Sequence, residues 1–358
     1  MRAIDLIHRW AGGVIGLILA VLGLSGAILA HKEEWIALPH AGDALVTDPA
    51  PLGDLAQRLM QGAAPGDSFV FANDRFGLVQ ARSGDAGYYA SQTGEVVSRW
   101  ASKWERPELW LFDLHHHLFS GDTGEAVAGT AGLAAILFVI TGAILWWRTR
   151  RTFRFRLWPA RMTGPAIRMQ HRDLGIIASP LLFLLALTGT MLIFRPVAQA
   201  VLAPLGGAST ISAELKAPEL SSGPLSSGPL SAGPHSAGLD WRGIVATAHA
   251  RFPDARLRTI SLPRKAGAPI TIRMRRAAEW LPNGRTTLWF DAADGAFLAE
   301  RDALSLSPPS QAFNMVYPIH AAKVGGLAWR IAITLAGLAM AVLGTFAVWS
   351  FWRPRPRR

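Results

Sequence analysis

The stretch His8-Arg9-Trp10-Ala11-Gly12 decides the fold of this chain, because it recurs as His171-Arg172-Asp173-Leu174-Gly175. A long apolar run follows each copy. Ser25-Gly26 lies as far beyond His8 as Thr188-Gly189 lies beyond His171. A run of roughly 20 apolar residues is long enough to cross a bilayer as a helix. The sequence therefore predicts two equivalent membrane helices, each with a histidine near its start.

A second pair of segments repeats at one constant offset. The matching residues are His115, Gly121, Gly132, Trp147 and Arg148 in one copy and His320, Gly326, Gly337, Trp352 and Arg353 in the other. Repeats of this kind in membrane chains fold around a pseudo-symmetry axis, with their sites at the repeat interface. We therefore expect a membrane α-helical protein, a four-transmembrane-helix bundle built from two repeats with two small α+β extracytoplasmic inserts.

Composition agrees with membrane helices that alternate with soluble segments. Of the 358 residues 50% are hydrophobic, and the formal net charge is +11. Cysteine is absent, which excludes disulfides, iron–sulfur clusters, thiolate zinc sites and thiol catalysis. The ten histidines are then the main source of transition-metal ligands. Much of the positive charge lies beside membrane helices, so membrane lipid is an expected partner and nucleic acid is not.

The predicted boundaries follow from these runs. They are 1–31 (first membrane helix), 32–114 (first insert), 115–148 (second helix), 149–170 (basic loop), 171–195 (third helix), 196–319 (second insert), 320–352 (fourth helix) and 353–358 (basic tail). Within the second insert, 221–238 repeats Ser, Gly and Pro and reads as a linker. Each insert is expected to hold one helix, at Leu55–Met60 and Leu239–Phe252, followed by an antiparallel sheet.

Arginines predict the topology. Eight of them lie from Arg148 to Arg172, and the tail after Trp352 is also basic. Excess Lys and Arg in short segments marks the cytoplasmic side. Both termini are then cytoplasmic and both inserts lie outside a bacterial inner membrane, in the periplasm of a Gram-negative cell. A cleaved signal peptide is the competing interpretation of the first run, but Ala11–Ala30 is longer than a signal's apolar region.

The repeat sorts the histidines into pairs. His8 and His171 lie at the inner ends of two helices, and His115 and His320 lie at outer ends. Neutral imidazole is the usual protein ligand of haem iron. Two histidines from facing helices fill both axial positions, which suits electron transfer. We therefore predict an inner haem on His8 and His171 and an outer haem on His115 and His320, dividing a span of about 30 Å.

Alternatives remain for the outer ligands. His31 or His117 could replace one of them, and His116 also lacks a counterpart in the other repeat. Neighbouring residues on a helix face different ways, so only one of His115, His116 and His117 should bind the same iron. A histidine at a membrane boundary can also be a simple interfacial side chain.

Glycines and basic residues each allow two interpretations. Small side chains in the first helix could leave room for a flat macrocycle or pack helices directly; these are Gly12, Gly13, Gly16, Gly23 and Gly26. The basic residues of the second insert could attract an anionic metal chelate, or form a solvated sheet face or a contact with lipid head groups. They are Arg256, Arg258, Arg264, Lys265, Arg273, Arg275 and Arg276.

Five stretches resemble the PepSY-associated transmembrane proteins, a family that includes iron-regulated membrane proteins and haem-containing siderophore reductases. They are His8-Arg-Trp-Ala-Gly-Gly, Leu114–Gly121, Thr141–Trp147, His171-Arg-Asp-Leu-Gly and Tyr317-Pro-Ile-His320. The resemblance covers nearly the whole chain and implies two PepSY-like inserts. The chain departs from the commonest family pattern at His115-His116-His117, where one histidine is usual.

The resemblance implies two b-type haems in the four-helix core, with His8, His115, His171 and His320 as iron ligands. Electrons would pass from an inner donor, a quinol or a cytoplasmic flavoprotein, to a ferric siderophore or other ferric chelate outside, releasing ferrous iron. The expected function is thus a transmembrane ferric-siderophore reductase. The alternative is a non-enzymatic membrane protein whose inserts bind or restrain a periplasmic partner such as a protease. A metal permease ranks last, because its polar candidates within the spans are few: Ser25, Thr141 and Thr188.

Overall fold

The computed structural model describes residues 2–207, 210–216, 238–265 and 267–353. The predicted linker, apart from Gly238, and the tail beyond Arg353 lie outside the described residues. The chain forms two compact units. The helical unit comprises Met1–Lys32, Glu108–Leu202 and Val316–Arg358, and the sheet unit comprises Glu33–Pro107 and Ala203–Met315.

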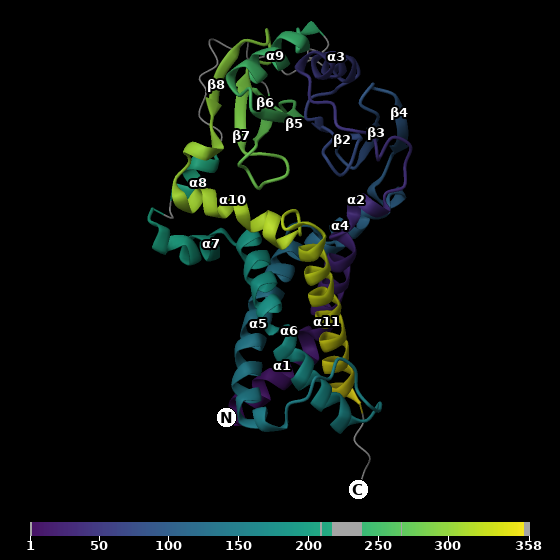
Figure 1. Ribbon diagram of the computed structural model, residues 1–358, viewed down its shortest axis with the longest axis vertical. Coiled ribbons are helices and arrows are strands. Elements are labelled where there is room, and N and C mark those ends of the chain that lie inside the picture. The colour runs from purple at the N-terminus through teal and green to yellow at the C-terminus, as the bar shows by residue number, and fades with distance from the viewer. Residues whose placement is uncertain (1, 208–209, 217–237, 266, 354–358) are drawn as a thin grey trace. The chain divides into compact units, whose positions relative to one another are not determined.

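Four long helices make up the core of the helical unit (Figure 1). They are α1 (Arg2–Leu29), α5 (Gly121–Thr149), α6 (Gly164–Ile193) and α11 (Gly326–Trp352). Each is long and apolar enough to cross a membrane, as the sequence predicts. Contacts link α1 to α5, α5 to α6, α6 to α11 and α11 back to α1, so the helices form a closed four-helix bundle.

The outer surface of this bundle is apolar. Val14 and Leu17 of α1, Leu137 of α5 and Leu335 of α11 are each about 60% exposed. Water would disfavour so many uncovered aliphatic side chains, whereas lipid tails accept them without cost. The chain is therefore a membrane helical protein.

Helices α1 and α11 approach each other through glycines. A Cβ atom on Gly16 would lie 2.8 Å from the carbonyl oxygen of Gly344, and one on Gly23 would lie 2.6 Å from that of Gly337. Such small residues let membrane helices pack backbone to backbone. The expectation that they leave room for a macrocycle is therefore wrong for Gly16 and Gly23, and for Gly13, whose free side is filled by α11 as well.

The segments predicted as single helices over 115–148 and 320–352 are each divided by a turn. Helix α4 (Pro107–His117) precedes α5, and α10 (Pro308–His320) precedes α11. The turns contain non-glycine residues with left-handed backbone, at Leu118 (φ 46°), Phe119 (φ 59°) and Ala322 (φ 53°). A helix cannot continue through that conformation. In the other half of the bundle, α6 begins at Gly164 rather than at 171, so that His171 lies inside the helix.

The sheet unit contains one antiparallel sheet of eight strands in the order β4-β3-β2-β1-β5-β6-β7-β8. The first insert supplies β1 (Ser68–Val70), β2 (Val79–Ser83), β3 (Ala86–Ala90) and β4 (Val96–Trp100). The second supplies β5 (Ala255–Ser261), β6 (Ile270–Arg276), β7 (Thr286–Phe290) and β8 (Phe297–Arg301). The sequence predicted two separate modules. Instead β1 pairs with β5, with Phe69 opposite Ile260. In two separate sheets β1 and β5 would each be an unpaired edge strand, and pairing removes both of these edges.

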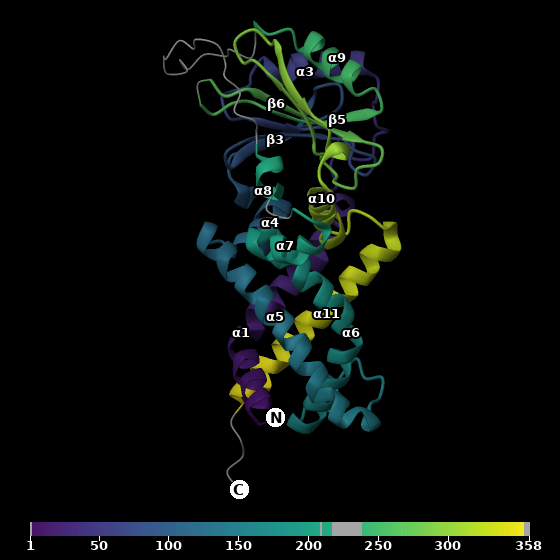
Figure 2. The ribbon, with the colours of Figure 1, turned by 90° about the vertical axis from the view of Figure 1, so that its left-hand side faces the viewer.

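Two helices cover one face of this sheet. Helices α3 (Pro49–Met60) and α9 (Trp241–Arg251) lie side by side over it (Figure 2), close to the positions that the sequence predicts. Their apolar sides and the inward strand residues form one core, which includes Leu55, Trp241, Ile260 and Phe290. Because residues of both inserts share this core, neither insert buries its apolar face alone.

The remaining helical segments are short. They are α2 (Lys32–Trp35), α7 (Arg195–Leu202), α8 (Thr210–Leu215) and the 3-10 turns at Lys103–Glu105, Arg150–Thr152, Ala203–Leu205 and Ala303–Ser305.

Arg258 of β5 ties the two inserts together. Its side chain is buried and donates hydrogen bonds to the carbonyl oxygens of Phe71 (2.7 Å) and Pro282 (2.9 Å), and also to that of Ala72. Burial lowers the pKa of Arg258 to about 10, which still leaves the guanidinium charged at neutral pH. Of the basic residues in this insert, Arg258 therefore has a structural role.

Two other basic side chains of the second insert pair with carboxylates. Arg256 lies 2.6 Å from Asp74, and Arg276 lies 3.1 Å from Asp254 and 2.7 Å from Asp302. Exposed ion pairs of this kind contribute little to stability. They do reduce the number of uncompensated charges that could attract an anion.

Candidate functional site

The histidines that the sequence pairs lie side by side in the helical unit. The ring centres of His8 (α1) and His171 (α6) are 6.2 Å apart, with the ring planes at 85°. Those of His115 (α4) and His320 (α10) are also 6.2 Å apart, with the planes at 42°. All four side chains are only half-buried, so each keeps surface that protein atoms do not cover.

The separation of 6.2 Å suits two imidazoles that share one metal ion. A metal–imidazole bond is about 2.0–2.1 Å long, and the nitrogen lies about 1.1 Å from the centre of its own ring. Two imidazoles on opposite sides of one ion therefore place their ring centres roughly 6.2–6.4 Å apart. The ring-centre separation of both pairs therefore matches that of two imidazoles that share a single iron.

Hydroxyl groups fix which nitrogen of His115 and His320 carries the proton. Ser25 Oγ donates its hydrogen to the carbonyl four residues earlier (2.7 Å) and lies 3.0 Å from His115 Nδ1. Thr188 Oγ1 likewise donates its hydrogen to the carbonyl of Leu184 (2.7 Å) and lies 3.0 Å from His320 Nδ1. Because each hydroxyl proton is already used, the hydroxyl oxygen accepts from Nδ1–H. The Nε2 atom of each ring then keeps its lone pair, as a metal ligand requires.

Two glycines let these rings lie against the membrane helices. A Cβ atom on Gly26 would lie 2.9 Å from Cε1 of His115, and one on Gly189 would lie 2.9 Å from Cε1 of His320. Carbon atoms normally keep about 3.5–4.0 Å between them. Only glycine therefore accommodates the imidazole at these two positions without a shift.

The other pair is supported in a related way. Thr141 Oγ1 donates to the carbonyl of Leu137 (2.6 Å) and accepts from His8 Nδ1 (2.8 Å), so His8 also keeps Nε2 free. The ring of His8 packs edge-on against Phe138, at 5.4 Å between centres. The ring of His171 lies near the backbone carbonyl of Leu343 in α11.

The residues after His171 hold the arginine loop in place. The carboxylate of Asp173 is fully buried and forms an ion pair with Arg172 (2.7 Å) and another with Arg156. A buried carboxylate needs such partners because its desolvation is costly. The motif thus combines a half-buried imidazole with a carboxylate that anchors the neighbouring loop.

The two pairs lie far apart along the bundle. Ser25, which holds His115, is 17 residues beyond His8 on the same helix. At 1.5 Å per residue this corresponds to about 25 Å along the helix axis.

The lower-ranked ligand candidates have other partners. His31 donates from Nε2 to Thr334 Oγ1 (2.9 Å), whose own hydrogen goes to the carbonyl of Arg330 (2.8 Å). The nitrogen that stays free on His31 is therefore Nδ1, the opposite of the arrangement at His115. His117 lies 3.1 Å from Asp113 through Nδ1 and 3.1 Å from His116 through Nε2.

Sequence reasoning missed the partners of the histidines. Ser25 and Thr188 entered it as markers of the repeat and, with Thr141, as polar residues that a permease could use, yet each of the three accepts a hydrogen bond from a histidine. The equal spacing of Ser25-Gly26 from His8 and of Thr188-Gly189 from His171 was the signal that could have revealed two of them.

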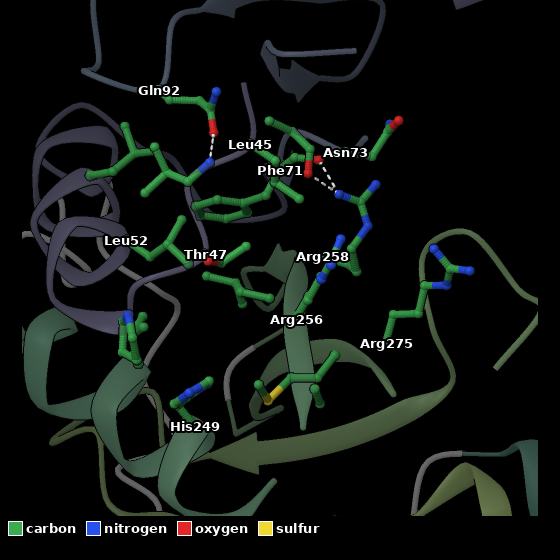
Figure 3. Close-up of a pocket in the computed structure, with 18 of the residues that line it drawn as sticks. Leu45, Thr47, Leu52, Phe71, Asn73, Gln92, His249, Arg256, Arg258 and Arg275 are labelled. Carbon is green, nitrogen blue, oxygen red and sulfur yellow. Dashed lines mark hydrogen bonds between the residues drawn. The ribbon is translucent and has the colours of Figure 1, made fainter. Parts of the chain in front are cut away.

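A pocket in the sheet unit is lined by residues of both inserts (Figure 3). Leu45, Leu52 and Phe71 supply apolar surface, and Arg275 supplies a cationic group, whereas the charge of Arg256 is balanced by Asp74, which also lines the pocket. A pocket of this composition can hold a ligand with an apolar body and an anionic group.

Comparison with known proteins identifies a family. The family model described as the PepSY-associated TM region matches residues 6–354. No curated protein matches the chain.

Proposed function

Because the chain belongs to the family of PepSY-associated transmembrane proteins, we propose that it is an inner-membrane haem b oxidoreductase. It passes electrons across the membrane to a ferric siderophore, or another ferric chelate, and so releases ferrous iron. The observation that carries this proposal is the equal spacing of 6.2 Å in the two histidine pairs.

The donor sets fit a haem at each pair. Imidazole is a common protein ligand of haem iron, and each pair would supply two imidazoles to one iron. Nδ1 of His8, His115 and His320 donates to a hydroxyl, which orients the ring and increases the basicity of Nε2. When bound, haem would supply one-electron transfer without an open site for oxygen.

The chain itself supplies the positions of the iron ligands, the protonation state of their nitrogens and the distance between the two sites. His8 and His171 would hold the inner haem, and His115 and His320 the outer haem. An electron path of about 25 Å is then divided into shorter steps. The reaction needs no side-chain acid or base: one quinol loses two electrons and two protons, and two ferric ions gain one electron each. A cytoplasmic flavoprotein is the other class of donor.

We further propose that the bundle is built from two repeats with PepSY-like modules outside the cytoplasm. The matched contacts of Gly26 with His115 and of Gly189 with His320 support the repeat. The arginines from Arg148 to Arg172 support a cytoplasmic location for that loop and for both termini.

The pocket in Figure 3 favours a second candidate function. In this alternative the chain is a non-enzymatic membrane protein whose sheet unit binds or restrains a periplasmic partner such as a protease. It predicts that the protein carries no cofactor and that changes at His8 and His171 leave its function intact.

Absorption spectra separate the two candidates. Full-length protein in detergent is measured oxidised and after dithionite reduction, and haem is counted per chain. We expect two six-coordinate, low-spin haems, and His8→Ala and His320→Ala should each lose one. The control His40→Asn changes an exposed histidine of the sheet unit, where Asn tolerates the positive φ of 64°. Colourless protein from cells supplied with haem would overturn the proposal and favour the binding role.

A further inference from the structure

A group of metal-binding side chains lies where α4 ends and α5 begins. His116 and His117 are the last two residues of α4, and Glu125 is in the second turn of α5. One ring nitrogen of each histidine and one carboxylate oxygen of Glu125 all lie within 4.8 Å of one another. None of these residues is needed for the histidine pairs described above.

The end of the helix lets two neighbouring histidines converge. Along a regular helix, adjacent side chains point in different directions. Here the helix ends at His117, and the next residue, Leu118, has a φ of 46°. The ring of His116 stacks on Phe112, with centres 5.4 Å apart and planes at 11°. Nδ1 of His116 then lies 3.1 Å from Nε2 of His117.

This nitrogen–nitrogen distance suits a shared ion. Two ligands in a tetrahedral site with bonds of about 2.0–2.1 Å are roughly 3.3 Å apart. Glu125 Oε1 lies 4.0 Å from the other nitrogen of His116, Nε2, and its side chain has enough rotatable bonds to bring the carboxylate toward the facing nitrogens.

A second carboxylate lies close to one of the imidazoles. Asp113 lies one turn before His117, and its Oδ1 atom is 3.1 Å from His117 Nδ1. No hydrogen bond joins these two atoms, but the negative charge of Asp113 favours a cation bound at the neighbouring imidazole. The side chains of His116, His117 and Glu125 are 28–36% exposed, so a hydrated ion can reach them.

We propose that His116, His117 and Glu125 bind one divalent transition-metal ion, with the charge of Asp113 adding to the attraction for the ion. Two imidazoles and one carboxylate suit zinc or ferrous iron and disfavour calcium and magnesium, which prefer oxygen ligands. Without metal the two facing nitrogens share one proton; metal binding moves that proton to the other nitrogen of His116, Nε2, so both rings stay neutral. Water completes the coordination. The site needs no haem and therefore does not depend on the proposed function.

Zinc binding to the full-length protein tests the site. Chelator-treated protein in detergent is titrated calorimetrically with Zn²⁺, and haem is counted on the same samples. Wild type should bind one ion per chain at this site. His117→Ala and Glu125→Gln should weaken binding at least tenfold, and Asp113→Asn, which removes only a nearby charge, should weaken it less. His40→Asn should bind as wild type does.

Each outcome is decisive. Glu125→Gln keeps the shape of the side chain, so lost binding with an unchanged thermal unfolding curve supports the site. Wild-type protein that binds no zinc, or variants that bind it as wild type does, would overturn it. So would a His117→Ala variant that loses haem and keeps its zinc affinity, because His117 would then be a haem ligand. Zinc binding by protein that carries no haem would support this site and contradict only the haem proposal.

Discussion

Replacing Gly189 by alanine should disturb the outer histidine pair and leave the inner pair intact. The added Cβ would lie 2.9 Å from Cε1 of His320, whereas carbon atoms normally keep at least about 3.5 Å. The imidazole must therefore move by roughly 0.6 Å. It cannot rotate freely, because Thr188 holds it through Nδ1.

The displacement is large enough to break that hydrogen bond. If the ring moves along it, the distance from Nδ1 to Thr188 Oγ1 grows from 3.0 Å to about 3.6 Å, which is too long for a hydrogen bond. Loss of an outer-shell partner typically weakens metal binding by about 10–100-fold, or about 1.4–2.8 kcal/mol. We expect the outer haem to dissociate faster by a similar factor.

The assay follows haem transfer from the detergent-solubilised protein to an excess of apo-globin. Two kinetic phases of equal amplitude are expected in wild type, and one should accelerate in Gly189→Ala. Gly175→Ala is the matched control on the same helix, since a Cβ there meets no atom within 4 Å. Both variants gain the helix propensity of alanine, about 0.8–1.0 kcal/mol, so a difference between them reports the histidine contact.

The reasoning fails if Gly189→Ala and Gly175→Ala retain haem equally well and have the same spectrum. The close approach of His320 to α6 would then have no bearing on cofactor binding. Gly26→Ala offers an independent check, because it presses on His115 in the same manner and should accelerate the same phase.

Three further changes test other parts of the structure. Arg258→Met leaves buried carbonyl groups without a donor, at about 1–3 kcal/mol each, so amide hydrogen exchange in β1 and β5 should become faster. Thr141→Val removes the acceptor of His8 Nδ1 and should weaken binding of the inner haem by about 10–100-fold. In the globin assay one kinetic phase should change, and the phase of the outer haem should stay as in wild type. Gly344→Val places methyl groups against the backbone of Gly16 and should lower the thermal unfolding temperature, whereas an unchanged temperature would contradict the close packing of α1 on α11.

Much of the helical unit could be predicted from the sequence, because hydropathy and repetition are strong local signals. The four apolar runs correspond to α1, α5, α6 and α11. The repeat also selects partners without any structure, since His8 aligns with His171 and His115 with His320. The repeat predicts that the two members of each pair lie on facing helices and come together through their side chains.

The turns before α5 and α11 had only a partial signal, the glycines Gly121, Gly325 and Gly326, which adopt positive φ there. Leu118, Phe119 and Ala322 adopt left-handed backbone, although none of them is a residue that prefers it. Tertiary packing therefore overrides local preference there. Glycine was ambiguous for a different reason, because close helix packing and room for an imidazole ring both require a small residue. Only the structure shows that Gly16 faces the backbone of Gly344 and that Gly26 faces the ring of His115.

The single sheet was also beyond the reach of local patterns. Alternation of apolar and polar residues indicates a strand, but it does not say which strand lies next to it. The pairing of β1 with β5 joins residues from inserts that lie on either side of two membrane spans in the sequence. From the strand patterns alone, the two inserts therefore look like two separate modules.

The β1–β5 pairing has a consequence for biosynthesis. Phe69 and Ile260 are about 190 residues apart, so the first insert leaves the ribosome long before its neighbouring strand exists. Until β5 arrives, β1 is an unprotected strand edge that can pair with other chains. Chaperones that bind extended segments should therefore associate with nascent chains that end between the two inserts, and release them once residues 255–261 have been synthesised.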